Sequence, residues 1–165
     1  MSLENLQYPS PEEESYRIFG VVHIVVGRDG LAFIFEEKSA KESTGKKAGD
    51  ISVLCETAIS GESIADTAKR GFQEEFGMPL DELHLKTIRL GGCKFIDGVY
   101  AEVLVSITDE PNILEQKALE NNGDGEVVYA GRCTINNLVQ NQRLRLGVRN
   151  VLNAFSDKLS MLTYS

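Results

Sequence analysis

Cysteine is scarce in this 165-residue chain, and its placement suggests neither a disulfide bridge nor a metal site. The three cysteines, Cys55, Cys93 and Cys133, are odd in number and widely spaced, with no C-x-x-C pair. This pattern argues against a disulfide framework and against a zinc site. A reducing compartment fits best, so we expect a cytoplasmic location.

Long apolar runs and a surplus of basic residues are also missing. No stretch approaches the roughly 18 apolar residues of a membrane-spanning helix, and the N-terminal segment lacks a basic region followed by an apolar one. The 17 basic residues are outnumbered by 25 acidic ones, which gives a net charge of −8. We therefore expect neither a membrane nor a nucleic acid polymer as partner. The composition is compatible with a small anionic ligand that is bound by a few basic side chains or by a metal.

The length and composition predict a single folding unit. A chain of 165 residues with 42% hydrophobic content is long enough for one sizeable core. We predict a flexible tail rich in proline and glutamate over residues 1–15 and one domain over residues 16–165, without an internal repeat.

Several segments have the residue types of β-strands. Two runs of β-branched and aromatic residues around positions 27–30 predict a hairpin. The polar segment 39–50 is expected to be an exposed loop, and ISVLC at 51–55 a short buried strand. ELHLKTIRL, VYAEVLVSIT and EVVYAGRC predict three more strands, whereas the acidic segment 109–125 is expected to be a long loop with one helical turn at most.

Two segments have helical spacing instead. The apolar residues on one face of the first are Ile64, Ala68, Phe72 and Phe76. Ser63 with Asp66 predicts an N-terminal capping box, and Gly77 is expected to end this helix. A second, long amphipathic helix is predicted over 144–159. The order of elements predicts an α/β fold of the α+β kind, with a mixed sheet flanked by helices.

The segment ETAISGESIADTAKRGFQEEFGM, residues 56–78, contains a motif of fixed spacing. It resembles the Nudix box, G-x5-E-x7-R-E-U-x-E-E-x-G-U, of enzymes that hydrolyse nucleoside diphosphates linked to another group. The positions that match in type and spacing are Glu62, Arg70, Phe72, Glu74, Glu75, Gly77 and Met78. The resemblance implies a Nudix-like α/β/α sandwich, and with the order of elements it covers roughly residues 16–160.

Two positions depart from this box by a reciprocal exchange. Glu56 stands where the family has glycine, and Gly71 stands where it has the first glutamate of its Arg-Glu pair. In the family, glutamates at the positions of 71, 74 and 75 hold Mg²⁺ or Mn²⁺, so the resemblance implies a metal at Glu74 and Glu75. A glycine in mid-helix costs about 1 kcal/mol relative to alanine. We predict that Glu56 reaches the space above Gly71 and replaces the missing carboxylate; the alternative is drift in an inactive relative, with Glu56 merely exposed.

The same resemblance implies supporting residues. Glu62 and Arg70 are predicted to form an ion pair that braces the loop against the helix. Family members often recruit a further carboxylate from a loop before a late strand, where Glu120, Asp124 and Glu126 are available. Glu126 is the preferred additional metal ligand because it adjoins the strand, and an idle surface acid is the alternative.

Other polar and aromatic residues allow two interpretations. Lys46 and Lys47 either meet a phosphate across the cleft or are simply solvated. His23, alone in its strand, is expected to be structural. Three aromatic residues are equally suited to stacking on a base and to the core: Phe95, Tyr100 and Tyr129.

Three functions compete at this stage. The first is a metal-dependent hydrolase with Glu56, Glu74 and Glu75 as catalytic residues, Mg²⁺ or Mn²⁺ as cofactor and a nucleotide-type substrate that the sequence does not identify. The second is a catalytically impaired Nudix-fold module that binds a nucleotide or regulates, since a fold can outlast its chemistry. The third is a scaffold that forms a homodimer through its C-terminal helix.

Overall fold

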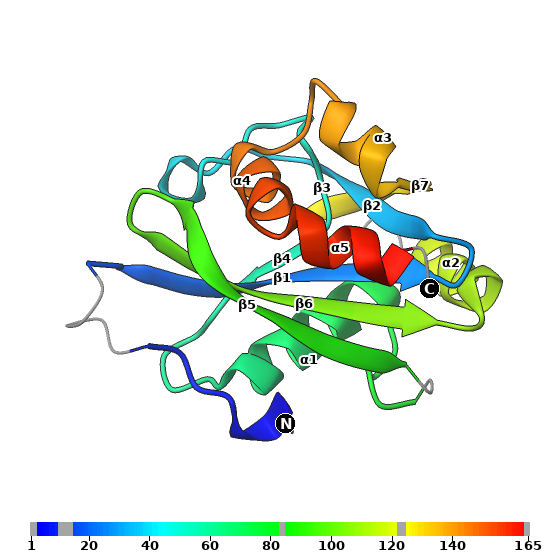
Figure 1. Cartoon of the computed structure of the whole chain (residues 1–165), viewed down its shortest axis with the longest axis horizontal. Helices are drawn as coiled ribbons and strands as arrows, with labels where there is room; N and C mark the ends of the chain where they lie inside the picture. Colours follow the sequence, from blue (N-terminus) through cyan, green and yellow to red (C-terminus); the bar gives the residue numbers. More distant parts are fainter. Residues whose placement is uncertain (1–2, 10–14, 83–84, 122–124, 164–165) are drawn as a thin grey trace.

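A mixed β-sheet forms the centre of the computed structural model, which describes residues 3–9, 15–82, 85–121 and 125–163 (Figure 1). Its strands are β1 (Ile18–Gly27), β2 (Leu31–Glu37), β3 (Ile51–Ser52), β4 (Leu54–Thr57), β5 (Lys86–Ile96), β6 (Val99–Thr108) and β7 (Val127–Thr134). The main path is β3-β2-β1-β6-β5, while β4 pairs with β1 and β7 with β2. β1 is parallel to β6, and the other pairings are antiparallel.

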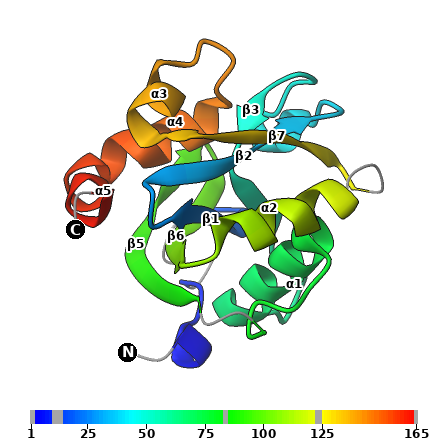
Figure 2. The same cartoon turned by 90° about the vertical axis from the view of Figure 1, so that its right-hand side faces the viewer.

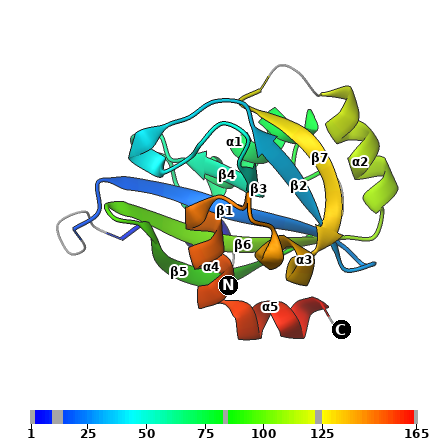
Figure 3. The same cartoon turned by 90° about the horizontal axis from the view of Figure 1, so that it is seen from above.

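Helices cover both faces of this sheet. They are α1 (Ile64–Phe76), α2 (Pro111–Glu120), α3 (Ile135–Gln140), α4 (Leu146–Ala154) and α5 (Ser156–Thr163), with short 3₁₀ turns η1 (Leu3–Asn5) and η2 (Glu42–Thr44). α1 and α2 lie on one face, and α3, α4 and α5 lie on the other (Figure 2; seen from above in Figure 3). The three layers confirm the predicted mixed-sheet α/β/α sandwich. No described helix is long and apolar enough to cross a membrane.

The side-chain alternation of β1 divides the core between the two faces. Val22 belongs to the cluster that contains Val148 of α4. Val25 points the opposite way and packs in the cluster that contains Phe72 and Phe76 of α1. Both phenylalanines are fully buried, which confirms the inward face predicted for this helix.

Both ends of α1 are fixed as predicted. The Ser63 hydroxyl accepts a hydrogen bond from the Asp66 N–H at 3.1 Å, and the Asp66 carboxylate accepts one from the Ser63 N–H at 3.5 Å. At the C-terminal end Gly77 has φ +68°, and its N–H donates to the Gln73 carbonyl at 2.9 Å. Only glycine adopts this left-handed backbone at little cost, so the helix stops here.

The prediction of a long loop over residues 109–125 is wrong for most of that segment, which forms the ten-residue helix α2. Pro111 occupies the first turn, where its missing N–H is harmless. Leu114 and Ala118, four residues apart, are buried against the α1 face of the sheet. Leu114 and Ala118 therefore anchor α2 on the core.

Three other predictions need correction. The C-terminal helix is interrupted at Phe155, whose φ of −115° separates α4 from α5. The ISVLC strand is two strands, because the chain crosses at Val53 from pairing with β2 to pairing with β1. The segment 39–50 is not simply exposed, since Thr44 and Lys46 are buried.

The N-terminal residues that the structure describes contact the core. Leu3, Leu6 and Tyr8 pack against the cluster that contains Val21 and Ile64.

Candidate functional site

A cavity of about 600 Å³ opens beside α1, within the range that small-molecule sites occupy. One side is formed by α1 and β4 and carries Glu56, Glu74 and Glu75. The opposite side is formed by the end of β2, the segment 41–46 and the residue before α4. The three glutamates predicted as catalytic therefore border one cavity.

Glu56 occupies the space that a side chain at position 71 would need. A Cβ built on Gly71 would lie 3.0 Å from the Glu56 Cβ and 3.3 Å from Glu56 Oε2. Glu56 is on β4 and Gly71 is on the buried face of α1, so the carboxylate reaches the helix from the sheet. This is the placement that the reciprocal exchange predicts; the role of Glu56 remains a prediction.

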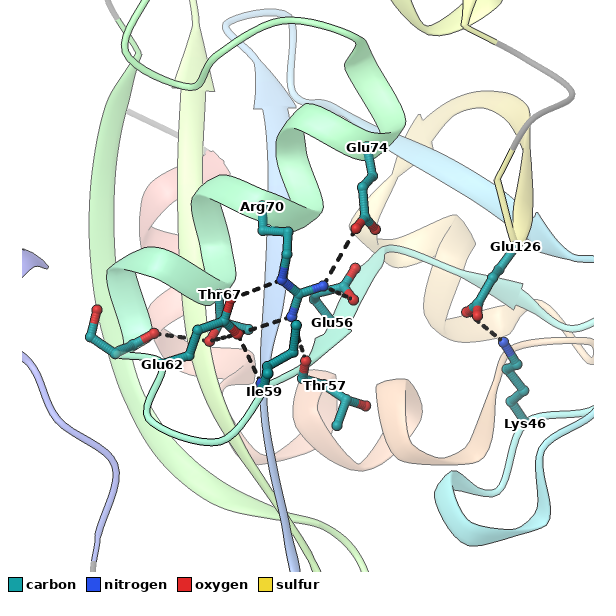
Figure 4. Close-up of polar contacts among 10 residues, drawn as sticks. Lys46, Glu56, Thr57, Ile59, Glu62, Thr67, Arg70, Glu74 and Glu126 are labelled. Atoms are coloured by element: carbon teal, nitrogen blue, oxygen red, sulfur yellow. Dashed lines mark hydrogen bonds and ion pairs between the residues drawn. The ribbon is translucent and has the colours of Figure 1, made fainter.

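Arg70 connects the box residues to one another (Figure 4). Its Nε donates to Glu62 Oε2 at 2.8 Å, so the predicted ion pair is present. Its Nη1 donates to Glu56 Oε1 at 2.7 Å and to Glu74 Oε1 at 3.4 Å, and its Nη2 donates to the Thr57 carbonyl at 2.7 Å. One guanidinium thus holds β4, the following loop and α1 together.

Glu62 braces the loop that leads into α1. Its Oε1 accepts hydrogen bonds from the Ile59 N–H at 2.9 Å and the Thr67 hydroxyl at 3.1 Å. Hydrogen bonding to Arg70, more than any other interaction, lowers the pKa of Glu62 to about 2. Glu62 is therefore a fixed anion whose hydrogen-bond partners are the helix and its loop.

The pKa values of Glu56 and Glu75 are raised, in contrast to that of Glu62. Burial raises the pKa of Glu56 to about 7, Arg70 opposes this rise, and the Glu74 carboxylate adds to it. Burial also raises the pKa of Glu75 to about 7, with repulsion from Glu56 and Glu74 next in size. A bound cation would relieve this repulsion, so the electrostatics suit a metal.

The additional acidic candidates lie in other surroundings. Glu126 borders the same cavity, but its carboxylate contacts Lys46 Nζ at 3.2 Å and its side chain is 84% exposed (Figure 4). Glu120 is exposed on α2, with Lys117 at 4.0 Å, and Asp124 lies outside the described residues. Within the part of the chain that the structure describes, no three acidic, histidine or cysteine side chains are close enough, as placed, to hold a metal ion.

The aromatic candidates are absent from the cavity lining, as far as the described residues define it. Phe95 is buried under Arg145, whose guanidinium carbon lies 5.0 Å from the ring centroid. Tyr100 packs on Tyr16 at 5.4 Å, and Tyr129 packs on Phe35 at 5.7 Å. No base-stacking role follows from these placements.

His23 has the structural surroundings expected of it. It is 2% exposed, and its Nε2 lies 2.7 Å from the Ser106 hydroxyl. Burial lowers the pKa of His23 to about 4, so the ring is neutral at physiological pH.

Two buried residues of the cavity were not predicted from the sequence. Glu37 and Arg145, only 4% and 5% exposed, form an ion pair of 3.1 Å. Lys46 joins them, with its Nζ 3.4 Å from Glu37 Oε2. The sequence offers little signal for them, since Arg145 stands between Leu144 and Leu146 in a segment that also contains Arg143 and Arg149.

Comparison with solved structures identifies the fold. No protein-family profile and no curated protein matches the sequence. A mutT/nudix family protein from Listeria innocua is similar in structure, with a TM-score of 0.62, 16% identity, and coverage of 91% of this chain and 99% of that one. A MutT protein from Methanosarcina mazei has a TM-score of 0.55, 13% identity, and coverage of 88% and 96%. A NUDIX hydrolase from Nitrosomonas europaea has a TM-score of 0.55, 17% identity, and coverage of 87% and 89%.

Proposed function

We propose that this chain, which has the Nudix hydrolase fold, is a metal-dependent hydrolase that cleaves the diphosphate bond of a nucleoside diphosphate linked to another group. The observation that carries the proposal is the Glu56 side chain, which fills the space above Gly71. Loss of the helix glutamate alone would not explain why a carboxylate from β4 lies in the same place. The exchange keeps three acidic residues on the α1 side of the cavity: Glu56, Glu74 and Glu75.

The residues present suit Mg²⁺ or Mn²⁺ in their chemistry. Both ions prefer oxygen ligands, and Glu56, Glu74 and Glu75 supply carboxylates whose charges oppose one another. Glu126, on the other side of the cavity, is a further candidate. When bound, the ion would neutralise the diphosphate and activate the attacking water. Because Arg70 contacts Glu56 and Glu74, these two side chains must turn from it to share a cation.

Arg70 and Glu62 have a positioning role in this proposal. Arg70 orients the Glu56 carboxylate from 2.7 Å, and Glu62 fixes Arg70 through two contacts of 2.8 and 2.9 Å. The depressed pKa of Glu62 keeps it charged throughout the neutral range, so the brace does not depend on pH there. The loop and the helix that carry the carboxylates are thus held in place before a ligand arrives.

The decisive experiment is a hydrolysis screen with Mg²⁺ and Mn²⁺. Nucleotide sugars, ADP-ribose, dinucleoside polyphosphates and nucleoside triphosphates are incubated with the protein, and released phosphate or nucleoside monophosphate is measured. Glu56→Gln should lower kcat on the order of 100-fold or more and change nucleotide affinity far less. The exposed Glu120→Gln is the matched control and should match the unmodified protein.

The same screen separates the hydrolase from a binding module. Thermal stabilisation by nucleotides without release of product from any substrate would reject the hydrolase and favour the impaired module. Turnover that survives Glu56→Gln unchanged would show that another residue replaces the missing carboxylate.

A further inference from the structure

The wall of the cavity that faces the carboxylates is basic. Lys46 and Arg145, each less than a tenth exposed, border it together with the exposed Lys41 at its edge. We call Lys41, Lys46 and Arg145 the basic wall. Glu37 lies between the two buried cations, 3.1 Å from Arg145 Nη1 and 3.4 Å from Lys46 Nζ. The cavity is thus acidic on the α1 side and cationic on the opposite side.

The buried cations have more hydrogen-bond donors than acceptors. An arginine and a lysine side chain together carry eight N–H donors. The acceptors that contact them among the described residues are Glu37, Glu126 and the Thr44 carbonyl. Arg145 Nε is buried and has no hydrogen-bond partner there. A donor left without an acceptor is unfavourable, so the spare N–H groups of Arg145 and Lys46 favour a ligand rich in acceptors.

The alternative, in which these charged residues only stabilise the fold, does not explain why both cations border the cavity. Arg145 is already held in place, since its guanidinium stacks on the Phe95 ring at 5.0 Å and pairs with Glu37. Glu37 thereby fixes both cations while neutralising only one of their charges. Glu126, the other acid at Lys46, is 84% exposed, so water screens its charge and the ion pair is weak. What remains at the cavity surface is a preset pair of cations with donors to spare, which matches the chemistry of a phosphate.

We propose that the basic wall binds a phosphate group of the substrate other than the diphosphate that is cleaved. This inference rests on the proposed hydrolase for its substrate but not for the binding itself. It names the substrate class: diphosphate compounds whose linked group or nucleoside bears a further phosphate, or a longer polyphosphate chain. A neutral linked sugar would supply hydrogen-bond acceptors but no negative charge to pair with Arg145 and Lys46.

The first test measures the wall without the metal site. Inorganic phosphate is titrated into the full-length protein in metal-free buffer containing a chelator, and binding is followed by calorimetry. Without a metal the carboxylates of α1 repel phosphate, so binding reports on the basic wall. Lys46→Gln should weaken binding about tenfold or more. The matched control is Lys47→Gln, which removes the same charge from an exposed neighbouring residue and should leave binding unchanged. Absence of binding at millimolar phosphate, or equal loss in both variants, overturns the proposal.

Arg145 needs a design that keeps the core folded. Arg145→Gln alone removes the 3.1 Å partner of the buried Glu37 and leaves it only the longer contact with Lys46, so it is combined with Glu37→Gln, which removes both charges of the pair. This double variant should retain its thermal transition and lose phosphate binding. Arg143→Gln, two residues away and 58% exposed, is the matched control and should bind phosphate normally. Normal phosphate binding by a folded Glu37→Gln/Arg145→Gln protein overturns the role of Arg145.

The second test asks whether the phosphate belongs to the substrate. NADH and NADPH, and dephospho-coenzyme A and coenzyme A, are pairs that differ by one phosphate and share a diphosphate. With Mg²⁺ present, kcat/KM should favour the phosphorylated member of at least one pair about tenfold, and Lys46→Gln should abolish that preference. Phosphate binding with equal kcat/KM within both pairs overturns the substrate assignment. Phosphate binding without turnover of any compound rejects the proposed hydrolase, and affinities within each pair measured by calorimetry then decide the role of the wall.

Discussion

The contact between Glu56 and Gly71 leads to a sharp prediction about stability. Gly→Ala in a helix interior is worth about 1 kcal/mol of stabilisation. In this chain the added methyl group would lie 3.0 Å from the Glu56 Cβ, which is the root of the side chain and is unable to rotate away. Overpacking of this kind costs about 1–3 kcal/mol, so Gly71→Ala should be neutral or destabilising by up to about 2 kcal/mol.

A double-mutant cycle isolates that contact. In a Glu56→Gly background the space is open, and Gly71→Ala should stabilise by the full helix term of about 1 kcal/mol. The coupling between the two sites is therefore about 1–3 kcal/mol. Glu56→Ala is the control, because it removes the carboxylate but keeps the Cβ, so the conflict with Ala at position 71 should persist.

The free energy of unfolding of each metal-free variant is measured by urea denaturation. Midpoints are compared among variants whose dependence on urea concentration has the same slope. Gly71→Ala that stabilises the unmodified protein by as much as it stabilises the Glu56→Gly protein would refute the reasoning. In that case the two positions would be independent, and the mid-helix glycine would have no structural link to Glu56.

Further predictions concern the site and its surroundings. The exchanged protein Glu56→Gly/Gly71→Glu should hydrolyse substrate at least as fast as the unmodified protein, whereas either single change should be slow in the same product-release assay. Because Glu75 has a pKa of about 7 in the folded protein against an ordinary 4.5, the folded state binds more protons between these values and stability falls as pH rises through them; Glu75→Gln should raise the Tm of the metal-free protein at pH 8, and an unchanged Tm would contradict the shift. The lowered pKa of His23 acts in the opposite direction, so stability is lost as pH falls from 6.5 to about 4, and His23→Leu should flatten that part of a Tm-against-pH curve. Leu114→Ala should cost about 2–5 kcal/mol in urea unfolding if α2 is packed on the core, and a cost below about 1 kcal/mol would contradict its burial.

Local patterns in the sequence were sufficient for α1 and its surroundings. The capping pair, the apolar face and Gly77 all act within one helix, so spacing alone predicts them. The Glu62–Arg70 contact, in contrast, is implied by the resemblance to the Nudix box. The sequence does not predict the helix α2, because the burial of Leu114 and Ala118 depends on a core built by distant segments.

The basic wall was beyond the reach of spacing arguments. Glu37 and Arg145 are 108 residues apart and meet only because β3 pairs with β2 while Ile51 hydrogen-bonds to the segment before α4. The sequence allows Lys46 either to contact a phosphate or to be solvated, and its burial excludes the second. Long-range pairings of this kind are set by tertiary topology and leave little trace in the local sequence.

The contacts of Arg70 have a consequence for how the molecule opens. Proteins exchange their amide hydrogens through partial openings of cooperative units. Since Arg70 of α1 contacts the Glu56 carboxylate and the Thr57 carbonyl of β4 at 2.7 Å each, the helix is unable to detach without breaking one ion pair and one hydrogen bond to the strand. The amides of α1 and β4 should therefore exchange as one unit with a shared free energy of opening. In an Arg70→Met protein the two elements should exchange separately, with the helix opening first.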